Sequence, residues 1–310
     1  MADPPPNLVV VVGATAVGKT RTALDMATAF RGEIVNGDAT AMYRLLDVGS
    51  AKPTACERAE VPHHLVDVAD PDELIAVSDY QEMAYAAIDE IATRGGTPFL
   101  VGGSGLFMRS VMEGYCFPPT APDAALRERL ETEAGARGGQ WLHARLSEID
   151  PVAAGRIHPN NIRRMVRALE VFEDTGKPIS HFWETREPRY TCVTVGLMRD
   201  REELWDRVDQ RVDAMFLAGL ADEVRGILER GYAATCPALR AIGYRQVVPY
   251  VRGEIGEEEA RDAVKSATRR LARQQLTSWF RADDPGIRWF AAGADDLREQ
   301  VHAFLAARGV

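Results

Sequence analysis

The sequence predicts an α/β protein in which helices flank a parallel β-sheet. Three short apolar runs, at residues 8–12, 33–36 and 98–101, each lead into polar residues flanked by glycine. Helical patterns, clearest at residues 78–93, lie between them, and strands that alternate with helices are typical of parallel sheets. Ligands of such sheets bind at the carboxyl ends of the strands. We therefore expect the polar residues after the three runs to surround one crevice.

The first apolar run leads directly into Gly13-Ala14-Thr15-Ala16-Val17-Gly18-Lys19-Thr20. This segment matches the phosphate-loop pattern G-x-x-x-x-G-K-[ST], and a helical pattern at residues 21–30 follows it. In this setting the backbone N–H groups form an anion-binding nest, and the helix N-terminus adds partial positive charge. Lys19 brings a cation to the terminal phosphate, and the hydroxyl of Thr20 can hold Mg²⁺. The sequence thus predicts a P-loop NTPase-like fold that binds a phosphate compound.

Two further polar residues follow the other runs. Asp38 comes after the second run, where a carboxylate can order Mg²⁺ through water or accept a proton. The alternative is an Asp that caps the following helix. Ser104 stands in Gly102-Gly103-Ser104-Gly105 after the third run, where glycines let the backbone approach a ligand and the serine offers a hydroxyl. A plain turn at the strand end is the alternative for this segment.

The composition changes after Pro118-Pro119. From residue 121 to 188 the pattern is helical, and we expect Asn160 to cap a helix that Gly176 and Pro178 end. A strand-like run at residues 191–197 then returns the chain to the sheet, and helices are expected at 201–230, 241–252 and 257–280. We therefore predict a P-loop α/β core at residues 1–119 and 190–310, with an inserted all-helical subdomain at residues 120–189.

The composition also bears on location. No apolar stretch approaches the roughly 18 residues that a membrane span needs. The proline-rich start lacks a basic region followed by an apolar one, so no secretory signal is expected. The four cysteines form no C-x-x-C pair, which disfavours structural zinc and disulfides and favours a reducing cytoplasm. The adjacent His63 and His64 have the wrong spacing for a helical metal pair, and a loop or core role is expected for them.

The charge is unevenly distributed. The net charge of −9 disfavours nucleic-acid binding over the whole surface, yet basic residues gather in three places. The clusters are Arg163, Arg164 and Arg167; Arg240 and Arg245; and Lys265, Arg269 and Arg273. One such cluster is usually a solvated helix face, but three of them near Tyr244, Trp279 and Phe280 favour contacts to RNA phosphates with base stacking.

These motifs, taken in order, resemble the bacterial tRNA dimethylallyltransferases, also called tRNA isopentenyltransferases. The resemblance extends from about residue 9 to 290. It rests on the phosphate loop and on residues 33–38, 47–53, 62–65, 101–107, 167–171, 240–246 and 268–274. It implies transfer of a dimethylallyl group from dimethylallyl diphosphate to N6 of the adenosine that is 3′-adjacent to the anticodon in tRNA, giving N6-isopentenyladenosine.

The resemblance also implies roles for individual residues. The loop at residues 13–20 is expected to hold the diphosphate, with Mg²⁺ as cofactor on Thr20. Asp38 is expected to remove the proton from the adenine amino group. Lys19, Ser104 and Arg211 are the other expected catalytic residues. The expected partner is the anticodon stem-loop of tRNA, and a monomer is expected.

In this family the helical insertion clamps the tRNA. The residues expected to contact tRNA here are Asp38, Ala39, Thr40, Ala41, Arg127, Asn161, Ile162, Arg163, Arg164, Met165, Arg167, Arg240, Gly243, Tyr244, Arg245, Arg269, Arg273, Gln274 and Arg281. The chain departs from the family pattern at Ala39, Ala41, Ser104 and Phe107, where Ser, Gln, Thr and Tyr are common. We expect activity to survive and base recognition near residues 39–42 to differ.

Three alternatives remain at this point. An ATP-dependent small-molecule kinase would use the same loop but would not need the basic C-terminal helices. An isopentenyltransferase acting on free adenine nucleotides would give the insertion and its arginines no role. An RNA-binding protein with an inactive transferase site would be consistent with Ala39, whereas Lys19, Thr20 and Asp38 argue against it.

Overall fold

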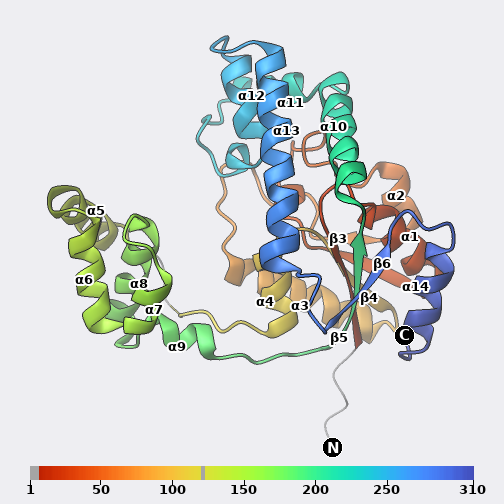
Figure 1. Ribbon diagram of the computed structural model, residues 1–310, viewed down its shortest axis with the longest axis horizontal. Helices are drawn as coiled ribbons and strands as arrows, with labels where there is room; N and C mark the ends of the chain where they lie inside the picture. Colours follow the sequence, from red (N-terminus) through yellow and green to blue (C-terminus); the bar gives the residue numbers. More distant parts are fainter. Residues whose placement is uncertain (1–6, 120–122) are drawn as a thin grey trace, which may run out of the picture. The chain divides into compact units, whose positions relative to one another are not determined.

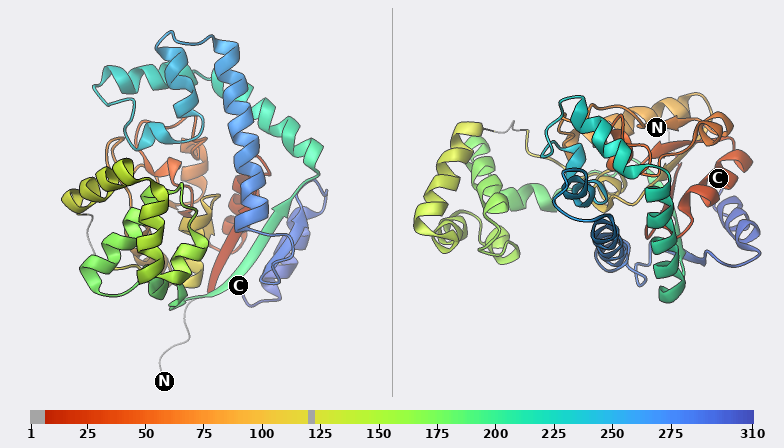
Figure 2. Two further views of the ribbon diagram at one scale, coloured as in Figure 1. Left: turned by 60° about the vertical axis from the view of Figure 1, so that its left-hand side comes forward. Right: turned by 90° about the horizontal axis from the view of Figure 1, so that it is seen from above.

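The computed structural model describes residues 7–119 and 123–310, so the proline-rich start and the predicted boundary at residue 120 lie outside the described residues. The chain divides into two compact units. The first unit combines the segment up to Met112 with Arg189–Val310, and the second is Glu113–Pro188, the helical segment coloured from yellow to green in Figures 1 and 2. The helical unit therefore begins earlier in the chain than the sequence pattern indicates.

The first unit contains a six-stranded parallel sheet in the order β3-β2-β4-β1-β5-β6 (Figure 1). The strands are β1 (Asn7–Gly13), β2 (Gly32–Asn36), β3 (His63–His64), β4 (Thr97–Val101), β5 (Thr191–Met198) and β6 (Ile287–Ala291). The predicted α/β fold is confirmed. The sequence reading missed β3 and β6; His63 and His64, expected in a loop or in the core, form a short edge strand instead.

Strand β1 lies at the centre of the sheet and is buried on both faces. Val9 and Val11 pack into one apolar cluster with the helices α1 (Lys19–Ala29) and α14 (Leu297–Ala306). Leu8, Val10 and Val12 point the opposite way, into a cluster with α3 (Val77–Thr93) and α4 (Gly105–Glu113). Because both faces are covered by helices, the strand reads as a continuous apolar run rather than an alternating one.

The C-terminal helices of the first unit pack around a third apolar cluster. They are α10 (Arg201–Leu217), α11 (Leu220–Glu229), α12 (Tyr244–Val251) and α13 (Glu257–Gln274), and the short helix η2 (Ala238–Arg240) packs into the same cluster. The short helices α2 (Ala55–Glu60) and η1 (Thr40–Met42) lie elsewhere in the unit. The prediction of one helix over residues 201–230 is wrong, because Gly219 adopts a left-handed φ of 92° that separates α10 from α11. The predicted helix over residues 257–280 ends as a π-helical turn, Gln275–Trp279.

The second unit is all helical apart from its connections and has its own apolar core. Its helices are α5 (Ala124–Arg137), α6 (Gly139–Ile149), α7 (Pro151–Arg156), α8 (Ile162–Thr175) and α9 (Ile179–Glu184). The expectation that Asn160 caps α8 is wrong by one residue, since the side chain of Asn161 accepts the hydrogen bond from the Arg164 N–H. Gly176 ends the helix in the left-handed conformation, as predicted. Among the helices of the described ranges, none combines the length and apolarity needed to cross a membrane.

Candidate active site

The phosphate loop joins β1 to α1 and has the backbone that its sequence predicts. Gly13 has a φ of 144°, and a Cβ there would lie 2.6 Å from the carbonyl oxygen of Leu197 on the neighbouring strand. Gly18, with a φ of 116°, caps the helix that starts at Lys19. The Nζ of Lys19 donates to the carbonyls of Gly13 (3.0 Å) and Ala14 (2.9 Å). The lysine therefore curls back over the loop, where an anion on the loop amides would meet it.

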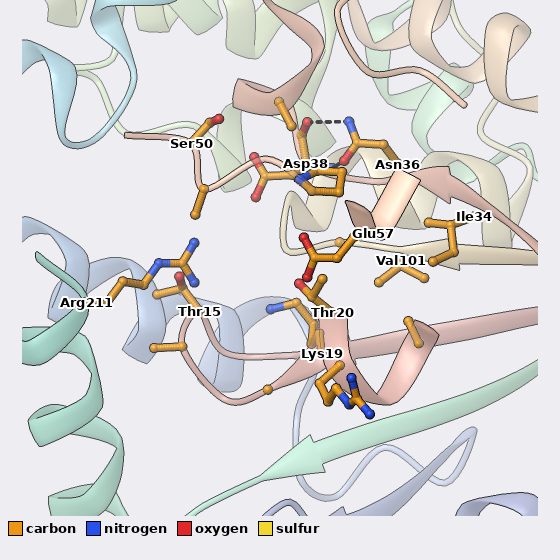
Figure 3. Close-up of a pocket in the computed structure, with 18 of the residues that line it drawn as sticks. Thr15, Lys19, Thr20, Ile34, Asn36, Asp38, Ser50, Glu57, Val101 and Arg211 are labelled. Carbon is orange, nitrogen blue, oxygen red and sulfur yellow. Dashed lines mark hydrogen bonds between the residues drawn. The ribbon is translucent and has the colours of Figure 1, made fainter. Parts of the chain in front are cut away.

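The side chains of Lys19, Arg211 and Asp38 line one cavity beside this loop (Figure 3). The side chain of Lys19 keeps some contact with solvent, yet burial lowers its pKa to about 8, against the opposing effect of the nearby Asp38 charge. Burial also lowers the pKa of Arg211, and Asp38 again opposes the shift. Arg211 reaches the site from α10, so the tertiary fold brings together the three charged residues that the sequence reading selected.

Asp38 stands between two adjoining cavities. The first has a volume of about 570 Å³ and is lined by the phosphate loop, by Asp38 and Arg211, and by the apolar side chains Ile34, Ala41, Val66 and Val101. The second, of about 370 Å³, shares Thr15, Asp38, Ser50, Arg211, Leu271 and Gln275 with the first. It extends to Ala39, Thr40, Ser104, Gly243 and Trp279. A group bound in one cavity can therefore meet a group bound in the other beside the Asp38 carboxylate.

The backbone around Asp38 is held by a buried asparagine. Asn36 is 8% exposed; its Oδ1 accepts from the Asp38 N–H (2.9 Å), and its Nδ2 donates to the carbonyls of Asp38 and Leu65 (2.9 Å each). The Oδ1 of Asp38 accepts from the Thr40 N–H (3.0 Å). The alternative role of Asp38, capping the following turn, is thus real for one carboxylate oxygen. Its other oxygen makes no hydrogen bond within the described part of the chain.

Ser104 ties the third strand-end loop to the second. Its Oγ accepts from the Ala39 N–H (2.9 Å), and its own N–H donates to the Gly37 carbonyl (3.1 Å). The two loops approach so closely that a Cβ on Gly102 would lie 2.2 Å from the Gly37 carbonyl oxygen. Ser104 therefore positions the segment that carries Asp38, and Ala39 contributes through its backbone rather than through a side-chain hydroxyl.

The sequence reading missed several residues of the site, among them Arg207, Gln275 and Glu57. Arg207, one helical turn before Arg211 on α10, lines the first cavity, and its Nε donates to the carbonyl of Ala16 in the phosphate loop (2.9 Å). Gln275 lines both cavities. The first two had a signal in the sequence: Arg207 has the i, i+4 spacing from Arg211, and Gln275 is a polar residue four positions after Leu271 on an otherwise apolar helix face.

The arginines expected to contact tRNA fall into two groups. Several are already paired within the protein: Arg127 and Arg167 with the fully buried Glu170, Arg269 with Asp209, and Arg281 with Asp283. Others are exposed and form no ion pair within the described residues, namely Arg163, Arg164, Arg245 and Arg273. The arginines of the second group can bind phosphate without first giving up a carboxylate. Arg240 is exposed but donates through Nε to the Thr235 carbonyl (2.8 Å).

Two of the expected RNA contacts are ruled out for side chains. Met165 is fully buried in the core of the helical unit, while Asn161 and Ile162 at the start of α8 are half-buried and Gln274 is exposed. Tyr244 is also fully buried, so it cannot stack on a base. Phe280, at 1% exposed, is a core residue as well, whereas Trp279 borders the second cavity. Apolar packing outweighed the apparent stacking role because Tyr244, at the start of α12, packs into the third apolar cluster and Phe280, directly after the π-helical turn, packs into the second.

The buried Tyr244 supports a structural prediction. Its hydroxyl donates to the carboxylate of Glu223 (2.7 Å), which also accepts from the backbone N–H groups of residues 47–49. We expect Tyr244→Phe to lower the free energy of unfolding by about 2 kcal/mol, because a hydrogen bond to a charged group is lost. Affinity for an anticodon stem-loop RNA should stay within twofold. Chemical denaturation and RNA titration check this, with Tyr250→Phe as the matched control, because the hydroxyl of the half-buried Tyr250 bonds to Glu257 at the surface. Weakened RNA binding at unchanged stability would contradict it.

The fold and the site together define a class: an α/β protein with a P-loop, in which the phosphate loop lies beside an acidic residue that lines two adjoining cavities. The model of the IPP transferase family matches residues 41–283. A tRNA dimethylallyltransferase of Roseiflexus castenholzii is 48% identical over 96% of this chain and 97% of its own length. The chain therefore belongs to the IPP transferase family, and the predicted family and transferase class are confirmed.

Solved structures agree with this assignment. The tRNA isopentenylpyrophosphate transferase of Bacillus halodurans is 41% identical, with a TM-score of 0.73 over 97% of this chain and 96% of that one. The tRNA isopentenylpyrophosphate transferase of Staphylococcus epidermidis is 31% identical, with a TM-score of 0.71 over 98% of this chain and 99% of that one. Because nearly the whole of each chain is covered, the helical unit belongs to the shared architecture.

Proposed function

We propose that this protein transfers a dimethylallyl group from dimethylallyl diphosphate to N6 of the adenosine 3′-adjacent to the anticodon in tRNA. The observation that carries the proposal is the position of Asp38 in the wall shared by two cavities. One cavity combines a phosphate loop with apolar side chains, which suits a short prenyl diphosphate. The other suits a flat base that enters beside Ser104 and Trp279.

The first cavity has polar and charged groups that suit the diphosphate of the donor and apolar side chains that suit its hydrocarbon part. Loop amides and Lys19 suit the diphosphate, and Arg207 and Arg211 add positive charge from α10. The apolar side chains Ile34 and Val101 suit the five-carbon chain. Because the diphosphate is the leaving group rather than the group transferred, these contacts stabilise charge that grows as the C–O bond breaks.

A magnesium ion fits the oxygen donors present. The hydroxyl of Thr20 and the carboxylate of Glu57 line the same cavity, and Figure 3 shows the Glu57 side chain directed toward Thr20. Mg²⁺ prefers oxygen ligands and is often held by one or two protein groups together with substrate phosphates. The described residues contain no cluster of three or more His, Cys, Asp or Glu side chains that could hold a metal without such help. When bound, the ion would neutralise diphosphate charge.

The proposed reaction balances with the residues at the junction. The N6 nitrogen attacks C1 of the dimethylallyl group, the bond from C1 to the diphosphate oxygen breaks, and the electron pair leaves with the diphosphate. The free oxygen of Asp38 accepts the proton that N6 releases. An aromatic amino group is a weak nucleophile, so general-base assistance of about 10²–10⁴-fold is the expected contribution of this carboxylate.

The tRNA would be held mainly by its phosphates. The unpaired arginines come from both units, with Arg163 and Arg164 on α8 and Arg245 and Arg273 on the C-terminal helices. Removing an adenine from a stack costs a few kcal/mol, and less in a loop than in a duplex. Phosphate contacts from these residues would offset that cost.

We expect Arg273→Ala to weaken binding of an anticodon stem-loop RNA and to lower the slope of log K against log salt by about 0.7, the value for one lost phosphate contact on a single strand. RNA titrations at several salt concentrations measure this. Arg281→Ala is the matched comparison: Arg281 is bonded to Asp283 in the free protein, so its removal should change the slope less. Equal slopes for wild type and Arg273→Ala would contradict the assignment.

The direct test is incubation with dimethylallyl diphosphate, Mg²⁺ and total tRNA lacking the modification, followed by mass spectrometry of the nucleosides. N6-isopentenyladenosine is the expected product. Parallel reactions with AMP and with ATP examine the other two enzymatic alternatives. Prenylated AMP would overturn the tRNA specificity, and phosphoryl transfer from ATP without prenylation would overturn the reaction itself.

A further inference from the structure

Gln275 connects two loops of the site through both ends of its side-chain amide. It is 3% exposed; its Oε1 accepts from the Thr15 N–H (2.8 Å), and its Nε2 donates to the Gly103 carbonyl (2.8 Å). Thr15 belongs to the phosphate loop, and Gly103 directly precedes Ser104. The glutamine therefore spans the gap between the loop that would hold the leaving group and the loop that supports the proton acceptor.

The backbone of Gln275 is fixed as firmly as its side chain. It opens the π-helical turn Gln275–Trp279 at the end of α13, and its carbonyl accepts from the N–H of the buried Phe280 (2.8 Å). Single π turns within helices occur frequently at functional sites. Trp279 packs so closely on the third strand-end loop that a Cβ on Gly105 would lie 2.1 Å from its Cγ. The turn thus locks the end of α13 against this loop.

A continuous chain of hydrogen bonds follows from these contacts. The phosphate loop is bonded to Gln275, Gln275 to Gly103, and the adjacent Ser104 to the N–H of Ala39, which neighbours Asp38. Each link is a single well-formed bond between residues that are far apart in the sequence. This side chain therefore links the anion-binding loop to the segment that carries Asp38, in addition to the pairing of their strands within the sheet.

We infer that Gln275 is a positioning residue, which holds the donor's diphosphate and the Asp38 carboxylate at the separation that the transfer requires. The inference rests on the proposed function. A misplacement of about 1 Å between reacting groups can lower a rate about 10²-fold. Gln275 lines both cavities, and the role inferred for it is exerted through its bonds to Thr15 and Gly103.

The test compares Gln275→Met, which keeps the length of the side chain but removes both bonds, with Gln81→Met. Gln81 is a matched control because it is also buried, at 7% exposed, and its Nε2 donates to the carbonyl of Ser110 on α4. Single-turnover prenylation of an anticodon stem-loop RNA at saturating donor, the Kd of inorganic diphosphate, the Kd of the RNA and the Tm are measured for each variant. Gln275→Asn, which keeps the amide on a shorter chain, serves if the Met variant does not fold.

We expect the Gln275 variants to lower the single-turnover rate about 100-fold and to weaken diphosphate binding severalfold, with RNA affinity unchanged within twofold. Gln81→Met should lower the Tm comparably and leave the rate near that of wild type. A Gln275 variant that reacts at the wild-type rate, or that loses rate only as Gln81→Met does, would overturn the inference. A wild-type protein that prenylates no RNA would instead overturn the proposed function, and the diphosphate affinities would still report whether Gln275 positions the loop.

Discussion

We expect Asp38→Asn to lower the single-turnover rate of prenyl transfer by about 10²–10⁴-fold at neutral pH, the usual contribution of a general base. Asparagine keeps the oxygen that accepts from the Thr40 N–H, and the bonds from Asn36 reach only the backbone of residue 38. The local fold should therefore survive. What is lost is the ability of the second oxygen to take a proton from N6.

The same substitution should not weaken donor binding. Asp38 is the negative charge that opposes the pKa shifts of Lys19 and Arg211, so its removal leaves two cations with less compensation beside the diphosphate. The Kd of inorganic diphosphate should stay equal or fall, while RNA affinity stays within a few fold. Asp284→Asn is the control, because Asp284 makes the same kind of local bond, to the N–H of Gly286, on an exposed turn. A near-normal rate with pre-bound RNA would remove Asp38 from the mechanism.

We expect Lys19→Gln to lower the rate about 10²–10³-fold and to abolish a pH dependence of donor binding that the wild type should show. Burial holds the pKa of Lys19 near 8, so the free site loses this cation as the pH rises through that value. Only the ammonium form attracts the diphosphate strongly. The Kd of the wild type should therefore rise about fivefold between pH 8 and pH 9, by the usual proton linkage.

Folding stability depends on pH in the opposite sense to diphosphate binding: this lysine makes the protein more stable as the pH rises. Between about pH 8 and the ordinary lysine pKa of 10.5, the unfolded chain keeps this proton and the folded chain releases it. The unfolded state then binds more protons, so this one group makes the free energy of unfolding increase with pH across that window. Bound diphosphate should stabilise the ammonium form of Lys19 and thereby reduce the effect.

Calorimetric titration with inorganic diphosphate from pH 7 to 9.5 measures the donor-binding part of the Lys19 prediction. Lys177→Gln, an exposed lysine of the helical unit, provides the control and should show the wild-type profile. A pH-independent Kd for the wild type, or an unchanged pH profile in Lys19→Gln, would show that this amine does not titrate in the donor site.

Contiguous features were predictable because local geometry alone produces them. The phosphate loop needs only its two glycines, the preceding buried run and the helix that starts at Lys19, all within one short segment. Asp38 and Ser104 were also predictable, since strand ends in a parallel sheet meet at one edge. By contrast, the one-residue error at Asn160, the break at Gly219 and the short strand β3 show that element boundaries depend on details weaker than periodicity.

The residues expected to contact RNA show that the sequence did not predict the partners of polar side chains. Tyr244 and Arg269 each resemble an RNA contact in a linear reading, yet one is buried against Glu223 and the other is paired with Asp209. Hydrophobic periodicity indicates which face of a helix is turned inward, but not which partner a polar side chain finds there. Those partners lie 21 and 60 positions away in the sequence.

The sequence by itself thus determined the α/β class with its parallel central strands, the phosphate loop, the acidic residue beside it and the family. The tertiary structure alone decided that Asp38 separates two cavities, that only some of the arginines remain free for phosphate, and that Gln275 joins loops lying 260 and 172 positions before it. The physical reason is the distance along the sequence over which each interaction acts. Backbone conformation follows from neighbouring residues. Burial, ion pairing and the spacing of reactive groups depend on contacts that exist only once the chain has folded.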